Sequence, residues 1–165
     1  MMNRFLGLAL AAAVALPSTA FAVDDCTKPS EWKPVKDDTA FKRVKVQISV
    51  RNDTDGVVIA QFNWTDTAGN KLQGPTKSMV NGQSVRNEMI IKGVDGTADF
   101  QTVLGDYGTA RFQMKFKEIK ESRFMPLRFP DNVKCDRNFA GKDNIWKINY
   151  TVQPPTSKLP PSVQR

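Results

Sequence analysis

The sequence has no histidine and only two cysteines, and it carries neither a Gly-x-Ser-x-Gly elbow nor a glycine-rich phosphate loop. These absences remove the usual pairs of nucleophile and base, and they leave no Cys/His set that could cage a zinc ion. We therefore expect no enzyme activity, no metal and no cofactor. Glycoside hydrolysis stays open as an alternative because it needs only two carboxyl groups, although most acids here lie in turns or among basic residues on outer strand faces.

Long apolar runs are also scarce. The one at the N-terminus spans Phe5 to Leu16, which is shorter than the roughly 20 residues of a membrane-spanning helix. It follows Arg4 and precedes Ala20-Phe21-Ala22, the order of features in a secretory signal peptide, so we predict a signal over residues 1–22. An N-terminal membrane anchor is the alternative. Removing 22 of the 165 residues leaves 143, enough for one domain.

The charge balance is basic. The chain carries a formal net charge of +7, and since Arg4 belongs to the predicted signal, the remainder carries +6. Such a surface favours anionic partners. The even cysteine count in an exported chain predicts a Cys26–Cys135 disulfide. Acidic residues precede Cys26, which argues against a lipid-bearing cysteine.

Apolar and polar residues alternate with the period of a half-buried strand in several places. The predicted strands cover residues 44–50, 58–64, 76–80, 85–91, 99–104, 110–116 and 146–152. The first two are predicted to form a hairpin around the turn at residues 52–56, which lacks the acid that a calcium loop needs at its last position. We predict a single antiparallel β-sandwich, immunoglobulin-like or actinoporin-like, over residues 44–153. Residues 23–43 would be tied to it by the disulfide, and residues 154–165 would form an extended, disordered, proline-rich tail.

Particular side chains can be assigned to faces from this alternation. The run at residues 110–116 places Phe112, Met114 and Phe116 inward, and its intervening residues give a basic outer face that includes Lys115 and Lys117. Trp64 and Trp146 fall on inward positions and are interpreted as core residues rather than as ligand platforms. Trp32 either packs on the edge of the sandwich near the disulfide or is exposed for binding.

The segment from Lys120 to Lys142 departs most from strand periodicity and is predicted to be a long loop. Six basic residues against three acidic ones give it a net charge of +3, with aromatic residues in between. Cations and rings in one loop suit an anionic interface. The candidate ligand-binding residues are Lys120, Arg123, Phe124, Arg128, Phe129, Lys134, Arg137, Phe139, Lys142 and Trp32. The alternative is that Phe124, Leu127 and Phe129 cap the sandwich while the basic side chains are only solvated.

The order of several short motifs resembles the actinoporin and aegerolysin type of lipid-binding β-sandwich. The motifs are Val46–Val50 followed by Asn52-Asp53-Thr54, the Gly69 turn followed by Pro75, the Gly82 turn, Gly96-Thr97-Ala98-Asp99-Phe100, Gly108-Thr109-Ala110-Arg111-Phe112, and Asn138-Phe139-Ala140-Gly141-Lys142-Asp143. The resemblance implies recognition of a membrane surface. It does not extend to pore formation, because Pro29 and Pro34 stand where a pore-forming sandwich has an amphipathic helix, and only Tyr107 and Tyr150 are present for a choline pocket.

Two functions are expected from these observations. The first is a periplasmic or secreted module that binds an anionic lipid surface or an acidic glycan. The second is an accessory, inhibitor or immunity-type protein that binds an envelope protein. A nucleic-acid partner is not expected for an exported chain.

Overall fold

The computed structural model describes residues 24–36, 43–92, 95–117 and 120–155. The predicted signal peptide and residues 156–165 of the predicted tail lie outside the described residues. Eleven strands and one short 3-10 helix, Gly105–Tyr107, follow one another along the described chain. The strands are β1 (Asp24–Asp25), β2 (Lys33–Pro34), β3 (Arg43–Asn52), β4 (Val58–Thr65), β5 (Lys71–Met79), β6 (Ser84–Lys92), β7 (Gly96–Val103), β8 (Thr109–Lys117), β9 (Glu121–Arg128), β10 (Val133–Ala140) and β11 (Ile145–Val152).

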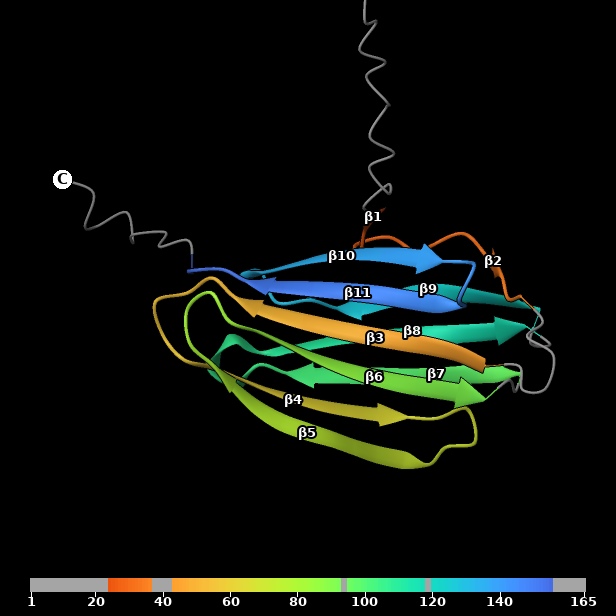
Figure 1. The fold of residues 1–165 in the computed structure, drawn as a ribbon, viewed down its shortest axis with the longest axis horizontal. Helices are drawn as coiled ribbons and strands as arrows, with labels where there is room; N and C mark the ends of the chain where they lie inside the picture. Colours follow the sequence, from red (N-terminus) through yellow and green to blue (C-terminus); the bar gives the residue numbers. More distant parts are fainter. Residues whose placement is uncertain (1–23, 37–42, 93–94, 118–119, 156–165) are drawn as a thin grey trace, which may run out of the picture.

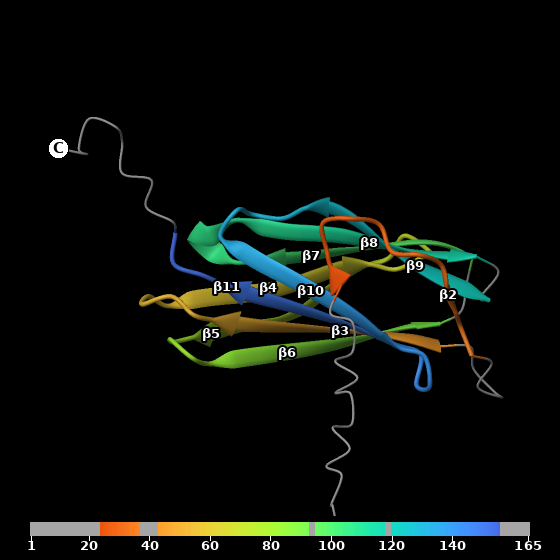
Figure 2. The ribbon, with the colours of Figure 1, turned by 90° about the horizontal axis from the view of Figure 1, so that it is seen from above.

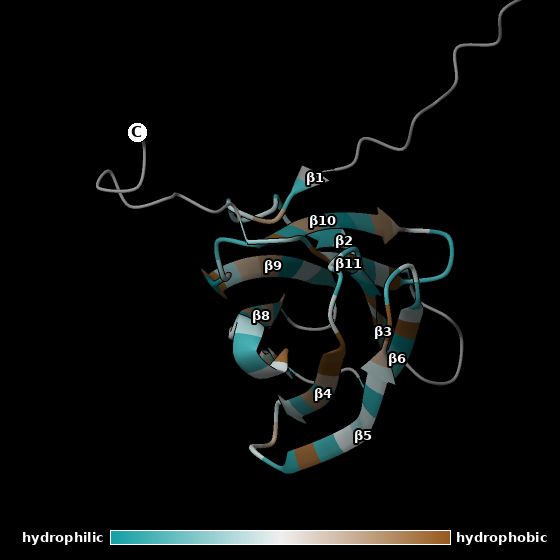
Figure 3. Cartoon of the chain, turned by 90° about the vertical axis from the view of Figure 1, so that its left-hand side faces the viewer, coloured by the Kyte–Doolittle hydropathy of each residue, from teal (hydrophilic) through white to brown (hydrophobic). Residues whose placement is uncertain are grey.

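The strands form two sheets that face each other, so the predicted β-sandwich is confirmed. The order is β1-β10-β11-β3-β6 in the five-stranded sheet and β2-β9-β8-β7-β4-β5 in the six-stranded sheet. Seen end-on, β10, β3 and β6 lie on one side and β9, β8 and β4 on the other (Figure 3). All strand pairs are antiparallel except β3 with β11, which run parallel, as their arrows show in Figure 1.

The core confirms the alternation read from the sequence. Phe112, Met114 and Phe116 on β8 are buried between the sheets, while Lys117 is exposed. Trp146 is 1% exposed and donates from its indole nitrogen to the Ser122 hydroxyl of the opposite sheet, at 2.8 Å. Trp64 is only half-buried, but it packs against the core, with its ring parallel to that of Phe100 at a centroid distance of 6.0 Å.

The predicted hairpin between residues 44–50 and 58–64 is wrong, because the two strands belong to different sheets. β3 pairs with β6 and β11, whereas β4 pairs with β5 and β7. The intervening turn carries the chain across the sandwich and is held by the buried side chain of Asn52. That amide donates to the carbonyl oxygens of Gly56 at 2.8 Å and Met79 at 2.9 Å. Turn residues alone did not distinguish such a crossing from a hairpin.

The prediction of one long loop from Lys120 to Lys142 is also wrong. The segment contains β9 and β10, which lie in opposite sheets and are joined by a short turn. Their alternation is masked because polar groups occupy inward positions. Ser122 is buried, and its hydroxyl accepts a hydrogen bond from Trp146. Arg137 lies under the N-terminal segment, with its guanidinium 4.9 Å from the Phe124 ring centroid.

Residues 24–36 close the side of the sandwich where β9 and β10 lie, and we call this segment the strap. Figures 1 and 2 show it running from β1, beside β10, to β2, beside β9. The predicted Cys26–Cys135 disulfide is confirmed and fastens one end, with its Cα atoms 5.4 Å apart. Buried Ser30 fixes the middle, since its backbone N–H donates to the Phe124 carbonyl at 3.0 Å and its hydroxyl accepts from the Phe124 N–H at 2.9 Å. The disulfide is compatible with an oxidising, exported environment.

Candidate functional site: a basic sheet face and an adjoining groove

The outer surface of strands β8 and β9 carries five basic side chains. Alternation along β8 and the first part of β9 directs these side chains away from the core that Phe112, Met114 and Phe124 fill, and a register shift near Leu127 brings Arg128 opposite Arg111. We call the following five residues the basic face: Arg111, Lys115, Lys117, Arg123 and Arg128.

Like charges stand directly opposite one another on this face. The register of β8 and β9 pairs Arg111 with Arg128 and Lys115 with Arg123. Directly opposed residues bring their Cβ atoms to roughly 5 Å, a spacing at which like charges are destabilising. These two like-charge pairs therefore lower the stability of the fold.

Carboxylates of the described chain do not neutralise these cations. Lys45–Glu88 and Arg51–Asp53 are ion pairs between described residues, and both lie outside this face. Of the two acids nearest in register, Glu121 lies opposite Lys117 without an ion pair, and Asp99 accepts a 2.9 Å hydrogen bond from the Gln113 side chain. The Nε atom of Arg111 is buried without a hydrogen-bond partner among the described residues. Among the described residues, the five cations of the basic face therefore have no carboxylate partner.

Trp32 of the strap forms one border of the basic face. Its ring centroid is 5.0 Å from the Lys117 amine and 5.8 Å from the Arg123 guanidinium. Arg123 is held further by a 2.8 Å bond from Nε to the Ser30 carbonyl. Of the two possibilities for Trp32, the structure shows the one in which it packs on the edge of the sandwich, and there its ring stacks on two cations of the face.

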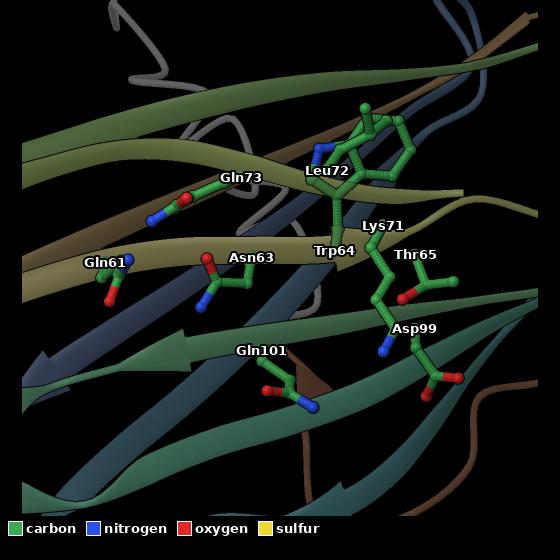
Figure 4. A pocket seen from close by; sticks show the side chains of 9 residues that line it. All are labelled: Gln61, Asn63, Trp64, Thr65, Lys71, Leu72, Gln73, Asp99 and Gln101. Atoms are coloured by element: carbon green, nitrogen blue, oxygen red, sulfur yellow. The ribbon is translucent and has the colours of Figure 1, made fainter. Parts of the chain in front are cut away.

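A groove of about 490 Å³ lies beside the basic face on the outer side of the same sheet (Figure 4). Most of its polar lining comes from alternate positions of β4, β5 and β7. The lining residues are Gln61, Asn63, Trp64, Thr65, Lys71, Leu72, Gln73, Asp99 and Gln101. We call this depression the amide groove, because four of these side chains are carboxamides.

The turn from β4 to β5 at one end of the amide groove is closed by hydrogen bonds to one carboxylate. Its Asp66 carboxylate accepts from the side-chain amide of Asn70 at 3.0 Å, from the Asn70 N–H at 2.8 Å and from the Ala68 N–H at 3.0 Å. The side-chain bond from Asn70 is the largest cause that holds the pKa of Asp66 below its ordinary value, and the backbone bonds add to it. Thr65 and Lys71, which flank this turn, line the groove.

The structure separates the ten residues proposed from the sequence instead of bringing them together. Arg123 and Arg128 lie on the basic face, Trp32 borders it, and Lys120 is exposed just before β9. The others lie elsewhere. Phe124 is in the core, and Arg137 is 3% exposed beneath the strap and donates to the Lys28 carbonyl. Phe129 packs against Tyr150, and Phe139 packs against Trp146. Lys134 is exposed on β10, and Lys142 is exposed in the turn after it.

Sequence reasoning missed Arg111, Lys115 and Lys117 as site residues, although their signal was present. The alternation over residues 110–116 identifies a basic outer face. The alternation does not identify the neighbouring strand. The register with β9 shows that Arg123 and Arg128 extend the same basic face.

Other kinds of site find little support in the described part of the chain. No group of three or more His, Cys, Asp or Glu residues there could hold a metal ion. Among the same residues, no helix is long and apolar enough to cross a membrane. A second depression of about 420 Å³ beside the disulfide has Lys134 as its single basic lining residue. Comparison of the chain with family models, with curated proteins and with solved structures finds no match.

Proposed function

We propose that this chain is an exported, non-enzymatic binding protein that recognises an anionic surface, a lipid membrane or an acidic glycan, through the basic face of β8 and β9. The observation that carries the proposal is that Arg111 lies opposite Arg128 and Lys115 opposite Arg123, and that none of these four cations forms an ion pair with a described residue. The predicted signal peptide and the disulfide support export.

The basic face differs from the loop expected from the sequence in how it would bind. Phe124 and Phe129 pack within the protein, which supports the alternative that these rings belong to the sandwich. Binding would then depend on charge, with Leu127, 48% exposed, as the large apolar side chain of β9 that reaches solvent. Attraction of this kind is electrostatic and is screened by salt.

The test removes charge from the face and leaves the core intact. The basic-face variant is Lys115→Ser, Lys117→Ser and Arg128→Ser. Its matched control is Arg86→Ser, Lys92→Ser and Lys147→Ser, three exposed cations on the outer side of the five-stranded sheet. Both variants have the same net charge, and Arg137 is left unchanged because it is buried.

Binding is measured to vesicles containing phosphatidylglycerol, to acidic polysaccharides and to inorganic polyphosphate. Each cation near an anionic surface contributes about 1 kcal/mol, so the basic-face variant should bind at least one of these probes about a hundredfold more weakly than the parent, while the control changes far less. Equal binding of parent and basic-face variant to every probe would sink the proposal. The protein-partner function would then take its place, tested by capture from an envelope extract.

A further inference from the structure

The amide groove and the basic face form one continuous surface. β7 supplies the inner wall of the groove and is hydrogen-bonded to β8, which carries three cations of the basic face. In the register of these strands, Gln101 of the groove lies directly opposite Arg111, and Asp99 lies opposite Gln113. A ligand that crosses the strands would pass from carboxamides to cations without leaving the sheet.

The carboxamides of the groove are not used by the fold. The side chains of Gln61, Asn63, Gln73 and Gln101 form no hydrogen bond within the described residues, although other amides of the chain, such as Asn52 and Asn149, are bonded. Figure 4 shows these four side chains spread along the groove, while Trp64 and Leu72 lie together toward one end.

This lining selects a class of ligand. A carboxamide offers both donors and acceptors, as does a sugar hydroxyl, whereas an ionised phosphate or carboxylate offers acceptors alone. The basic face suits an anion, and the groove suits hydroxyl groups. From β5 to β9 there are four strand spacings of roughly 4.8 Å, or about 19 Å in all, which accommodates an oligosaccharide of several residues.

The geometry points to an acidic polysaccharide as the ligand, with sugar hydroxyls in the amide groove and the acidic groups of the same chain on the basic face. This inference rests on the proposed function and narrows its ligand. A phosphate polymer offers the groove no hydroxyl groups, and a single lipid headgroup is too short to reach across the strands from the groove to the basic face.

The variant that tests the groove removes three of its four carboxamides and keeps every charge. It combines Asn63→Ala, Gln73→Ala and Gln101→Ala. The control combines Gln47→Ala, Asn138→Ala and Thr151→Ala, which are polar residues on the outer side of the five-stranded sheet. Thermal melting of both variants establishes that the sandwich is intact.

The probes are hexasaccharides of galacturonate, mannuronate and hyaluronan, with inorganic polyphosphate and phosphatidylglycerol vesicles as anions without a sugar chain. The parent should bind at least one hexasaccharide more tightly than polyphosphate at equal charge. The groove variant should lose about tenfold or more of that affinity, as expected for three lost hydrogen-bonding groups, and bind polyphosphate and vesicles like the parent.

The outcomes separate this inference from the proposed function. If the groove variant binds every hexasaccharide as the parent does, or if the parent binds none of them more tightly than polyphosphate, the polysaccharide assignment is overturned. The proposed function survives that result when the basic-face variant still loses anion binding. If the basic-face variant binds all probes like the parent, both proposals fall together.

Discussion

At the scale of single residues, Asn52 is the polar side chain on which the crossing between the two sheets depends. It is fully buried, and besides its two donated bonds its carbonyl oxygen accepts from the Thr54 N–H at 2.8 Å and from the Thr54 hydroxyl at 2.7 Å. We expect Asn52→Ala to lower the free energy of unfolding by about 2–4 kcal/mol, because it leaves buried backbone groups unpaired.

The measurement for Asn52 is urea denaturation, with Asn138→Ala as the control. Asn138 is a half-buried β10 residue whose side chain forms no hydrogen bond within the described part of the chain, so its removal should cost less than about 0.5 kcal/mol. An Asn52 variant as stable as this control would contradict the role assigned to the amide.

Tyr150 gives the protein a defined response to alkaline pH. Its hydroxyl is buried without a hydrogen-bond partner among the described residues, and burial raises the pKa of the Tyr150 hydroxyl above its ordinary value of 10.0. Above pH 10 the unfolded chain therefore releases a proton that the folded chain keeps. Stability falls as pH rises from there, by up to about 1.4 kcal/mol per pH unit from this group.

The Tyr150→Phe variant should lose that part of the pH dependence. At neutral pH it should be as stable as the parent or slightly more stable, because it removes a buried hydroxyl that has no partner. The check is the free energy of unfolding of both proteins at pH 8 to 11. Parallel pH profiles for parent and variant would show that Tyr150 does not govern the alkaline loss.

At the scale of elements, β5 is shaped by a bulge that borders the amide groove. Its pairing with β4 shifts register between Gln61 and Asn63, where Gly74 and Pro75 stand opposite. A Cβ atom on Gly74 would lie 2.9 Å from the backbone carbonyl oxygen of Phe62 and 2.9 Å from the side-chain amide nitrogen of Asn87. Bulges bend a strand and redirect its side chains, so this one places Gln73 at the rim of the groove.

Gly74→Ala should lower the free energy of unfolding by about 1–3 kcal/mol, since the backbone of β4 cannot move away without losing its pairing. Gly141→Ala is the matched control, because its new Cβ would lie at an ordinary 3.6 Å from the Phe139 ring. Chemical denaturation measures both variants. Equal stability of the two would show that the approach of β5 to β4 is not tight.

The strands differ in how well the sequence predicts their inward residues. Strands such as β3, β8 and β11 follow a strict alternation, and their inward residues are predictable because these positions are apolar, apart from Asn52 at the end of β3. β9 and β10 place Ser122 and Arg137 inward, and these residues are stabilised by a tryptophan and a strap distant in sequence. The sequence predicted only the β8 part of the basic face, for a related reason. Alternation identifies the outer residues of one strand, but the partner strand follows from long-range pairing.

At the scale of the whole molecule, the disulfide ties the strap to a sandwich that would otherwise be open at β9 and β10. Cys26 and Cys135 are 109 residues apart. Replacing both with serine should lower the free energy of unfolding by up to about 4–5 kcal/mol in the chain-entropy account of such a loop. Urea titration of the double variant measures the loss. A variant with unchanged stability would mean that the strap's hydrogen bonds alone hold it.

The central claim concerns the whole surface, namely that anions bind on β8 and β9 and not elsewhere. Lysine acetylation with mass spectrometry tests it most directly, because Lys115 and Lys117 on the basic face can be compared with Lys92 and Lys147 on the opposite sheet. The protein is acetylated alone and with polyphosphate, phosphatidylglycerol vesicles or the uronate hexasaccharides. The account predicts that a bound probe protects Lys115 and Lys117 and leaves Lys92 and Lys147 reactive, and that raised salt abolishes the protection. Protection of Lys92 and Lys147 with Lys115 and Lys117 unaffected would contradict it.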